Sequence, residues 1–224
     1  MRILRSLSAI ALAVASRTSL AQGTGTPLPP ARFGFTGGLN LATFAGDGLG
    51  ATADRRGFVG GVDLVTPFSS NFSTQIEALY SMKGMKSLGQ NPRDYALFKL
   101  DYIEIPVMLR GDAPLSSSFK PFAFTGPALD IKISCGADGV ASGASVSASC
   151  GQLQSSSGGS KFNNPDFGWV TGAGLGFDFH DRRISFEARY EIGLRTITSG
   201  GSSKNRALSF MAAVEAPLPR RTRR

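Results

Sequence analysis

The stretch SFEARYEIGLR, residues 185–195, alternates between apolar and polar side chains. Apolar residues hold the even positions Phe186, Ala188, Tyr190, Ile192 and Leu194, and the odd positions include Ser185, Glu187, Arg189, Glu191 and Arg195. In a soluble antiparallel sheet the apolar face packs on a protein core and the polar face meets water. In a membrane barrel the apolar face meets lipid and the polar face is enclosed. Other features of the sequence are needed to decide between a soluble sheet and a membrane barrel.

Seven further stretches show the same alternation. They are residues 32–44, 57–66, 72–84, 99–110, 120–132, 166–179 and 206–218. Tilted strands of about 9–11 residues cross a bilayer core, whereas strands of soluble sheets are usually about 5–6 residues long. No convincing helical periodicity follows the N-terminal segment. The lengths therefore favour strands that cross a membrane.

The connections between these stretches alternate in length. TPFSSN, GDAPLSSS and HDRR are short, whereas the others are longer, and one of them runs from about Ser134 to Pro165. Short turns on one side and long loops on the other are typical of an outer-membrane barrel, with the short turns in the periplasm. We expect an all-β fold over residues 32–218, an eight-stranded antiparallel up-and-down transmembrane β-barrel with both ends in the periplasm.

Aromatic residues lie near the ends of the expected strands. Those expected near the periplasmic rim are Phe33, Phe35, Phe72, Phe122, Phe177 and Phe179. Those expected near the outer rim are Phe44, Phe58, Tyr80, Tyr95, Phe98, Phe167 and Trp169. Two such groups predict the aromatic girdles of a membrane barrel.

Polar positions of the expected strands would enclose a set of charged side chains. These are Asp63, Glu77, Lys83, Glu104, Arg110, Glu187, Arg189, Glu191 and Arg195. The interior of an eight-stranded barrel is just wide enough for side chains to fill it. Because an unpaired buried charge costs several kcal/mol, we expect a satisfied ion-pair network that plugs the barrel. A proton or ion path through the same charges is the alternative.

The N-terminal segment has the layout of a secretory signal peptide. Two arginines precede an apolar run over residues 7–15, and residues 19–21 form a small-x-small cleavage site. The run is too short to span a bilayer as a helix. We expect a signal peptide over residues 1–21, cleavage after Ala21, and a linker over residues 22–31.

The net charge of +8 belongs mainly to the two ends of the chain. Three arginines lie in the N-terminal segment and four in the basic tail, residues 219–224. The region between them is nearly neutral and has no basic stripe with interleaved aromatic residues, which excludes nucleic acid as an expected partner. The tail is expected to be a solvated end, with binding to an anionic polymer or lipid headgroup as the alternative.

Cys135 and Cys150 flank the segment GADGVASGASVSAS, which is rich in Gly, Ser and Ala and has no packing periodicity. In an exported protein such a pair is expected to form a disulfide that closes a loop. The chain-entropy estimate for this closure is roughly 3 kcal/mol. The spacing is not the CxxC of a redox site.

Several motifs together resemble a known family. They are GLNLATF (38–44), QIEALYSMKG (75–84), LDYIEIPVMLR (100–110), PFAFTGPALDIK (121–132) and SFEARYEIGLRTI (185–197). In this order they resemble the outer membrane protein β-barrel domain often called PorT-like or porin-family, over nearly all of residues 32–218. The resemblance implies a barrel in the outer membrane of a Gram-negative-type bacterium, often of unassigned activity, with some members linked to secretion or gliding machinery. Such barrels commonly end on an aromatic residue, whereas here Leu218 is followed by PRRTRR.

A structural or interaction barrel that works through its outer loops is the function these patterns favour. A narrow porin-like channel and a soluble lipocalin-like carrier are the alternatives, although an aqueous channel needs about twice as many strands. A lipid-modifying enzyme would need a nucleophile with a base near the outer rim, and the single histidine, His180, lies in a periplasmic turn. We therefore expect no enzyme, no cofactor and no metal. The expected partners are the bilayer, the barrel-insertion machinery and an unknown protein or ligand at the loops, for a chain that is a monomer.

Overall fold

The computed structural model describes residues 28–46, 50–91, 93–113, 115–116, 118–156, 163–198 and 202–219. The expected signal peptide lies outside these residues, as do most of the expected linker and all of the basic tail after Pro219. Within the described ranges, no helix has the length and apolar character needed to cross a membrane.

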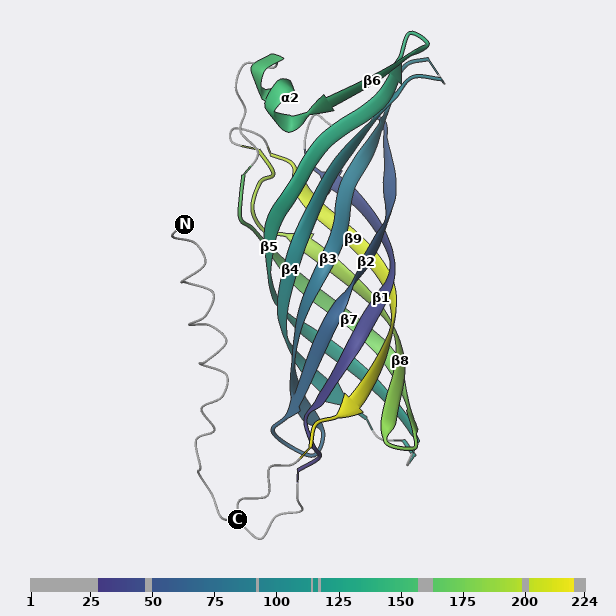
Figure 1. Cartoon of the computed structure of the whole chain (residues 1–224), viewed down its shortest axis with the longest axis vertical. Helices are drawn as coiled ribbons and strands as arrows, with labels where there is room; N and C mark the ends of the chain where they lie inside the picture. The colour runs from purple at the N-terminus through teal and green to yellow at the C-terminus, as the bar shows by residue number, and fades with distance from the viewer. Residues whose placement is uncertain are drawn as a thin grey trace.

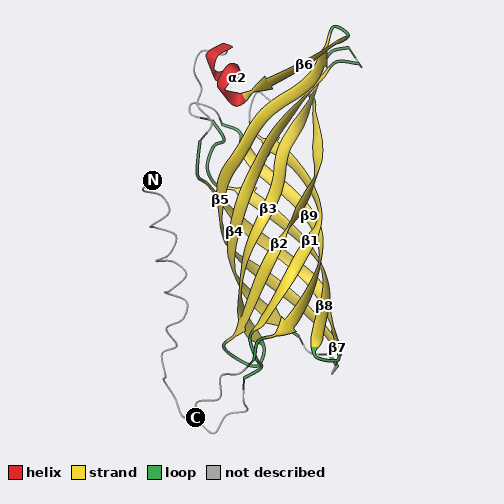
Figure 2. Ribbon diagram, in the orientation of Figure 1, coloured by secondary structure: helices red, strands yellow, loops and turns green. Residues whose placement is uncertain are grey.

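Nine strands and one short helix make up the described chain (Figures 1 and 2). In chain order they are β1 Arg32–Ala45, β2 Thr52–Pro67, β3 Phe72–Leu88, β4 Tyr95–Asp112, β5 Phe119–Ala141, β6 Ala144–Ser149, α2 Cys150–Ser156, β7 Asp166–Phe179, β8 Arg182–Gly193 and β9 Lys204–Pro217.

Eight of these strands form a closed antiparallel ring. β6 is not part of the ring. Each of the eight ring strands pairs with the next ring strand along the chain, so β5 pairs with β7. The ring closes where β1 pairs with β9, without a break from Arg32 opposite Pro217 to Ala45 opposite Lys204. The expected eight-stranded up-and-down barrel is confirmed, and its closure leaves no unpaired edge in the wall.

The period of two assigns each side chain of the wall to one face. On β8, Ile184, Phe186 and Ile192 are exposed on the outer surface. The residues between them, such as Glu187 and Arg189, are buried in the interior. The apolar parity of the sequence is therefore the outer face of the barrel.

Two of the expected girdle aromatics are instead buried in the interior, and a third, Phe98, is partly buried and packs against interior residues. Phe44 shares the buried parity of β1, and Phe122 shares that of β5. Phe122 and Phe124 lie opposite Gly174 and Gly172 of β7. A Cβ at Gly172 would lie only 2.6 Å from Cζ of Phe124, so these glycines make room for the two rings. Assigning Phe44 and Phe122 to the girdles was wrong. Glycine in the facing strand lets the Phe122 ring fit inside, and Phe44 packs inside the barrel with other buried apolar side chains.

We call the end of the barrel where β1 begins and β9 finishes the periplasmic end, and the opposite end the outer end, following the orientation expected from the sequence. The outer end is more regular than the sequence indicated. The segment expected to be a loop after Ser134 continues β5 and returns as β6, with Ser142 and Gly143 at the turn. Both turn residues have positive φ, 52° and 80°, as a tight hairpin turn requires. The short helix α2 follows, although no helix was expected. Figure 1 shows this hairpin and α2 beyond one end of the barrel, opposite the end where β1 begins and β9 finishes.

Candidate functional site

The interior contains a cation held by three carboxylates. The Lys83 ammonium on β3 lies 2.6 Å from Glu191, 2.8 Å from Asp130 and 3.2 Å from Glu104. All four side chains are buried. Because β3 and β8 lie on opposite sides of the ring, the Lys83 to Glu191 bond crosses the barrel. The same three carboxylates could hold a metal ion by their spacing, but the Lys83 ammonium already neutralises part of their charge.

A second bridge crosses the barrel closer to the periplasmic end. The Arg189 guanidinium on β8 donates to both carboxylate oxygens of Glu77 on β3, at 2.6 and 2.9 Å. It also pairs with Glu187 on its own strand. A bidentate arginine fixes the relative position of the two opposite walls.

A third set of pairs fills the periplasmic end. Arg110 donates to Gln75 at 3.0 Å and lies 3.5 Å from Glu215. Arg183 pairs with Asp112 at 2.9 Å. These contacts join β3, β4, β8 and β9, so charged pairs cross-link the interior from its middle to its periplasmic end.

Two of the expected interior residues differ from the expectation of a fully paired network. Arg195 is exposed, because β8 ends at Gly193 and the alternation ends with it, and its guanidinium donates to the Pro165 carbonyl at 2.6 Å. The prediction that Arg195 faces the interior was wrong. Asp63 is buried as expected, but neither of its carboxylate oxygens has a hydrogen-bond partner among the described residues.

Sequence reasoning missed five charged residues of the interior. They are Arg55, Asp130, Asp166, Arg183 and Glu215. Asp130 and Glu215 share their parity with Phe122, Ala128 and Met211, so the enclosed faces of β5 and β9 do not look polar in the sequence. With these included, eight carboxylates and five cations are buried, and the interior has an excess of acid.

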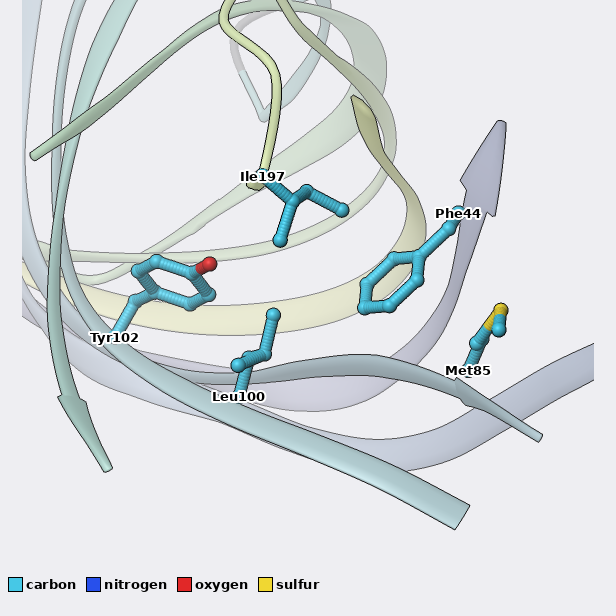
Figure 3. Packing of buried hydrophobic residues seen from close by; sticks show 5 residues of the cluster. All are labelled: Phe44, Met85, Leu100, Tyr102 and Ile197. Carbon is cyan, nitrogen blue, oxygen red and sulfur yellow. The ribbon is translucent and has the colours of Figure 1, made fainter. Parts of the chain in front are cut away.

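Toward the outer end of the interior, buried apolar side chains pack together instead (Figure 3). Phe44, Met85, Leu100, Tyr102 and Ile197 form this cluster, which we call the apolar lid. Ile197 comes from the segment between β8 and β9, and Figure 3 shows its side chain directed toward the other four. Phe98 on β4 and Cys135 on β5 pack against the lid.

The β5–β6 hairpin is tied to the barrel and open on one side. The disulfide expected between Cys135 and Cys150 is present, with the two Cα atoms 5.5 Å apart. Among the residues that the structure describes, β6 pairs only with β5, so its other edge has no partner strand there, and most of its residues are exposed. On the hairpin surface Lys99 pairs with Asp138. The hydrogen bond from Lys99, together with one from Ser147, lowers the pKa of the Asp138 carboxyl.

Comparisons with known proteins agree with this geometry. A model of the family described as outer membrane protein beta-barrel domain matches residues 21–199, most of the chain. A search of curated proteins finds no match.

Solved structures of outer-membrane barrels are similar in fold. Neisserial surface protein A has a TM-score of 0.51 at 12% identity, covering 84% of this chain and 97% of that one. OprG of Pseudomonas aeruginosa has a TM-score of 0.47 at 8% identity, covering 86% and 98%. The outer membrane enzyme PagL has a TM-score of 0.39 at 13% identity, covering 82% and 99%. At these identities the likeness concerns the fold alone.

Proposed function

We propose that this chain, which belongs to the outer membrane protein beta-barrel domain family and lies in the outer membrane, is a closed scaffold that presents the β5–β6 hairpin as an extracellular binding element. The observation that carries the proposal is the contrast between a filled barrel and a hairpin that extends beyond it with an open strand edge. The mature protein would begin after Ala21. We also propose that, within this family, the chain is similar to the PorT-like barrels.

Closure of the barrel is supported by two kinds of contact. Cross-lumen bonds from Lys83 and Arg189 occupy the middle, and the apolar lid covers the outer mouth. An ion entering from the outside would have to displace the lid and then break buried ion pairs, each costly to separate. The charged interior also argues against a lipocalin-like carrier, which needs an apolar cavity.

The hairpin is suited to binding by its construction. Loops on a rigid scaffold are where binding usually occurs, and an open strand edge can pair with an extended segment of a partner. The disulfide holds the hairpin base, so less ordering would be needed when a partner binds. The closed ring of the wall supports a monomer as the presenting unit.

A narrow channel is the second candidate, and the excess of buried carboxylates is the observation that favours it. Such a channel would select cations. For a lipid-modifying enzyme, His180 is the only histidine in the chain, and it lies in the turn between β7 and β8 at the periplasmic end. That position is far from the outer leaflet, where a lipid-modifying site would need its base. The position of His180 therefore supports a role without catalysis.

Single-channel recording in planar bilayers tests the closed scaffold. The native chain should show no stepwise conductance. A double variant that combines Lys83→Ala with Ile197→Ala should conduct more than the native chain. Regular cation-selective steps from the native chain would favour the channel instead.

The hairpin is tested by displaying the barrel on cells against a panel of purified glycans and matrix proteins. Binding seen with the native chain should be lost when residues 137–148 are replaced by a short glycine-serine link. It should persist when Asn71 in a periplasmic turn is changed to Ala. Retention of all binding without the hairpin would contradict the proposed role.

A further inference from the structure

Three basic side chains lie on the outside of the barrel near its outer end. Arg56 on β2 and Lys204 and Arg206 on β9 are exposed and share the outward parity of the lipid-facing residues. β1 lies between them, with Leu41 opposite Arg56 and Thr43 opposite Arg206. We call these three residues the outer basic patch.

The outer basic patch has no ion-pair partner among the residues that the structure describes. Asp54, two residues before Arg56, is the exposed acid on the same face of β2, so the local charge stays positive. At the periplasmic end, by contrast, Arg32 and Lys120 each pair with a carboxylate. The cations of the patch are therefore available to an external anion.

An apolar hollow of about 520 Å³ lies on the lipid-facing surface of β1, β9, β8 and β7. Its floor is made of small residues, Gly37 opposite Ala212 and Ala188 opposite Ala173. Its walls are formed by larger side chains: Leu39, Leu175, Phe186 and Phe210. All of these residues face the hydrocarbon region, where the available occupant is an acyl chain.

β9 connects the outer basic patch to the hollow. From Arg206 to Ala212 the strand runs six residues, roughly 20 Å at about 3.3 Å per residue. For a strand tilted by about 40° this is roughly 15 Å along the membrane normal. That depth is half of a hydrocarbon core about 30 Å thick, so an acyl chain below a headgroup at Arg206 reaches the hollow.

We propose that the outer basic patch and the hollow together bind one phosphorylated lipid of the outer membrane. The patch takes the headgroup phosphate through charge-assisted hydrogen bonds, and the hollow takes an acyl chain. The two observations are independent, since one concerns charge at the membrane surface and the other concerns shape within the hydrocarbon region. This site is separate from the hairpin and does not depend on its proposed role.

Trp169 provides a built-in reporter for this lipid. It is the only tryptophan in the chain, it is exposed on β7, and it lies opposite Ile192, which lies opposite Arg206. The full chain is folded into phosphatidylcholine vesicles containing a small fraction of brominated phosphatidylglycerol or, in a parallel sample, brominated phosphatidylcholine. Quenching of Trp169 by each brominated lipid then gives their relative occupancy beside the barrel.

The native chain should prefer the anionic lipid by about tenfold. Each lysine or arginine at a membrane surface contributes roughly fivefold, so the three residues of the patch are sufficient for this preference. The combined change Arg56→Gln, Lys204→Gln and Arg206→Gln should reduce this preference to below about twofold. The matched control Arg182→Gln, an exposed arginine at the periplasmic turn, should leave the preference unchanged.

The hollow is tested by Ala212→Leu, which fills it without adding charge and should lower the preference for the anionic lipid. Each substituted side chain is exposed, so the variants are expected to fold. Folding is checked by electrophoresis before and after heating, where every variant should show the same change in mobility as the native chain. Equal quenching of the native chain by both lipids would overturn the proposal, as would an anionic preference that survives the triple change. An unaltered preference in Ala212→Leu would remove the hollow from the site.

Discussion

The two faces of β8 differ in what they accept, although they are made by one strand. Ile184, Phe186 and Ile192 are separate apolar residues that need no specific neighbour. On the other face, Glu187 pairs with Arg189, and Arg189 also pairs with Glu77 from across the barrel. The lipid-facing surface therefore depends on polarity alone, whereas the enclosed surface depends on pairing.

The largest expected effect comes from breaking a pair inside. Arg189→Met removes the cation from between Glu77 and Glu187, and should cost about 3–5 kcal/mol of folding free energy because buried carboxylates are left uncompensated. Urea titration in lipid vesicles, followed by Trp169 fluorescence, measures this loss. Adding Glu77→Gln and Glu187→Gln should restore much of it, and a failure to do so would mean that the methionine disturbs packing instead.

A charge on the lipid-facing side should cost less, and its cost should depend on depth. Ala188→Arg, near the middle of β8, should cost about 2–4 kcal/mol, and Ile192→Arg only about 0–1 kcal/mol. Ile192 lies opposite Arg206, so this height already accommodates a basic side chain. The same urea titration compares the two variants, and equal costs would contradict the assignment of Ile192 to the outer rim.

Excess volume in the interior should have a smaller effect. Gly172→Ala places a Cβ against the Phe124 ring and the Ala188 carbonyl, both 2.6 Å away, and overpacking of this kind costs about 1–3 kcal/mol. Combining it with Phe124→Leu should recover part of the loss in the same assay. Gly143→Ala, at the hairpin turn where nothing lies within 4 Å of a Cβ, is the control for backbone strain alone.

The smallest effect is expected at the hairpin surface, where water screens the charges. Lys99 lowers the pKa of Asp138, so their pair stabilises the hairpin above the ordinary carboxyl pKa and is lost as the pH falls through the lowered value. Amide hydrogen exchange of residues 136–140 should be slightly faster in Asp138→Asn at pH 7. The difference from the native chain should vanish in acid, and a difference that persists there would show that the pair is not its cause.

The alternation in the sequence was sufficient to predict the strands of the wall and, where polar and apolar residues strictly alternate, the side on which each residue lies. Glu77 and Arg189 could be assigned to the interior because charged residues repeat on one parity of their strands. Their pairing could not be predicted, since it depends on β3 and β8 lying opposite each other in the closed ring.

The hairpin pairing and the inward position of the aromatic residues could not be predicted from the alternation. β5 and β6 pair through their backbones, and a run of Gly, Ser and Ala gives no alternation to detect. Phe122 faces inward because Gly174 lies opposite, which is information about register that a single strand does not contain. Arg195 lies beyond the last residue of its strand, where parity no longer applies.

The unbroken pairing of β1 with β9 has a consequence for the order of assembly. These strands are the first and last of the wall, so their ladder joins the residues farthest apart in the chain. Closing so long a loop is slow relative to forming neighbouring hairpins. We therefore expect the meeting of the two ends to be the final step of folding, with a free edge exposed on both strands until it occurs. A chain that lacks β9 should remain an open sheet that recruits other strands, so the complete barrel forms only after its last segment has arrived.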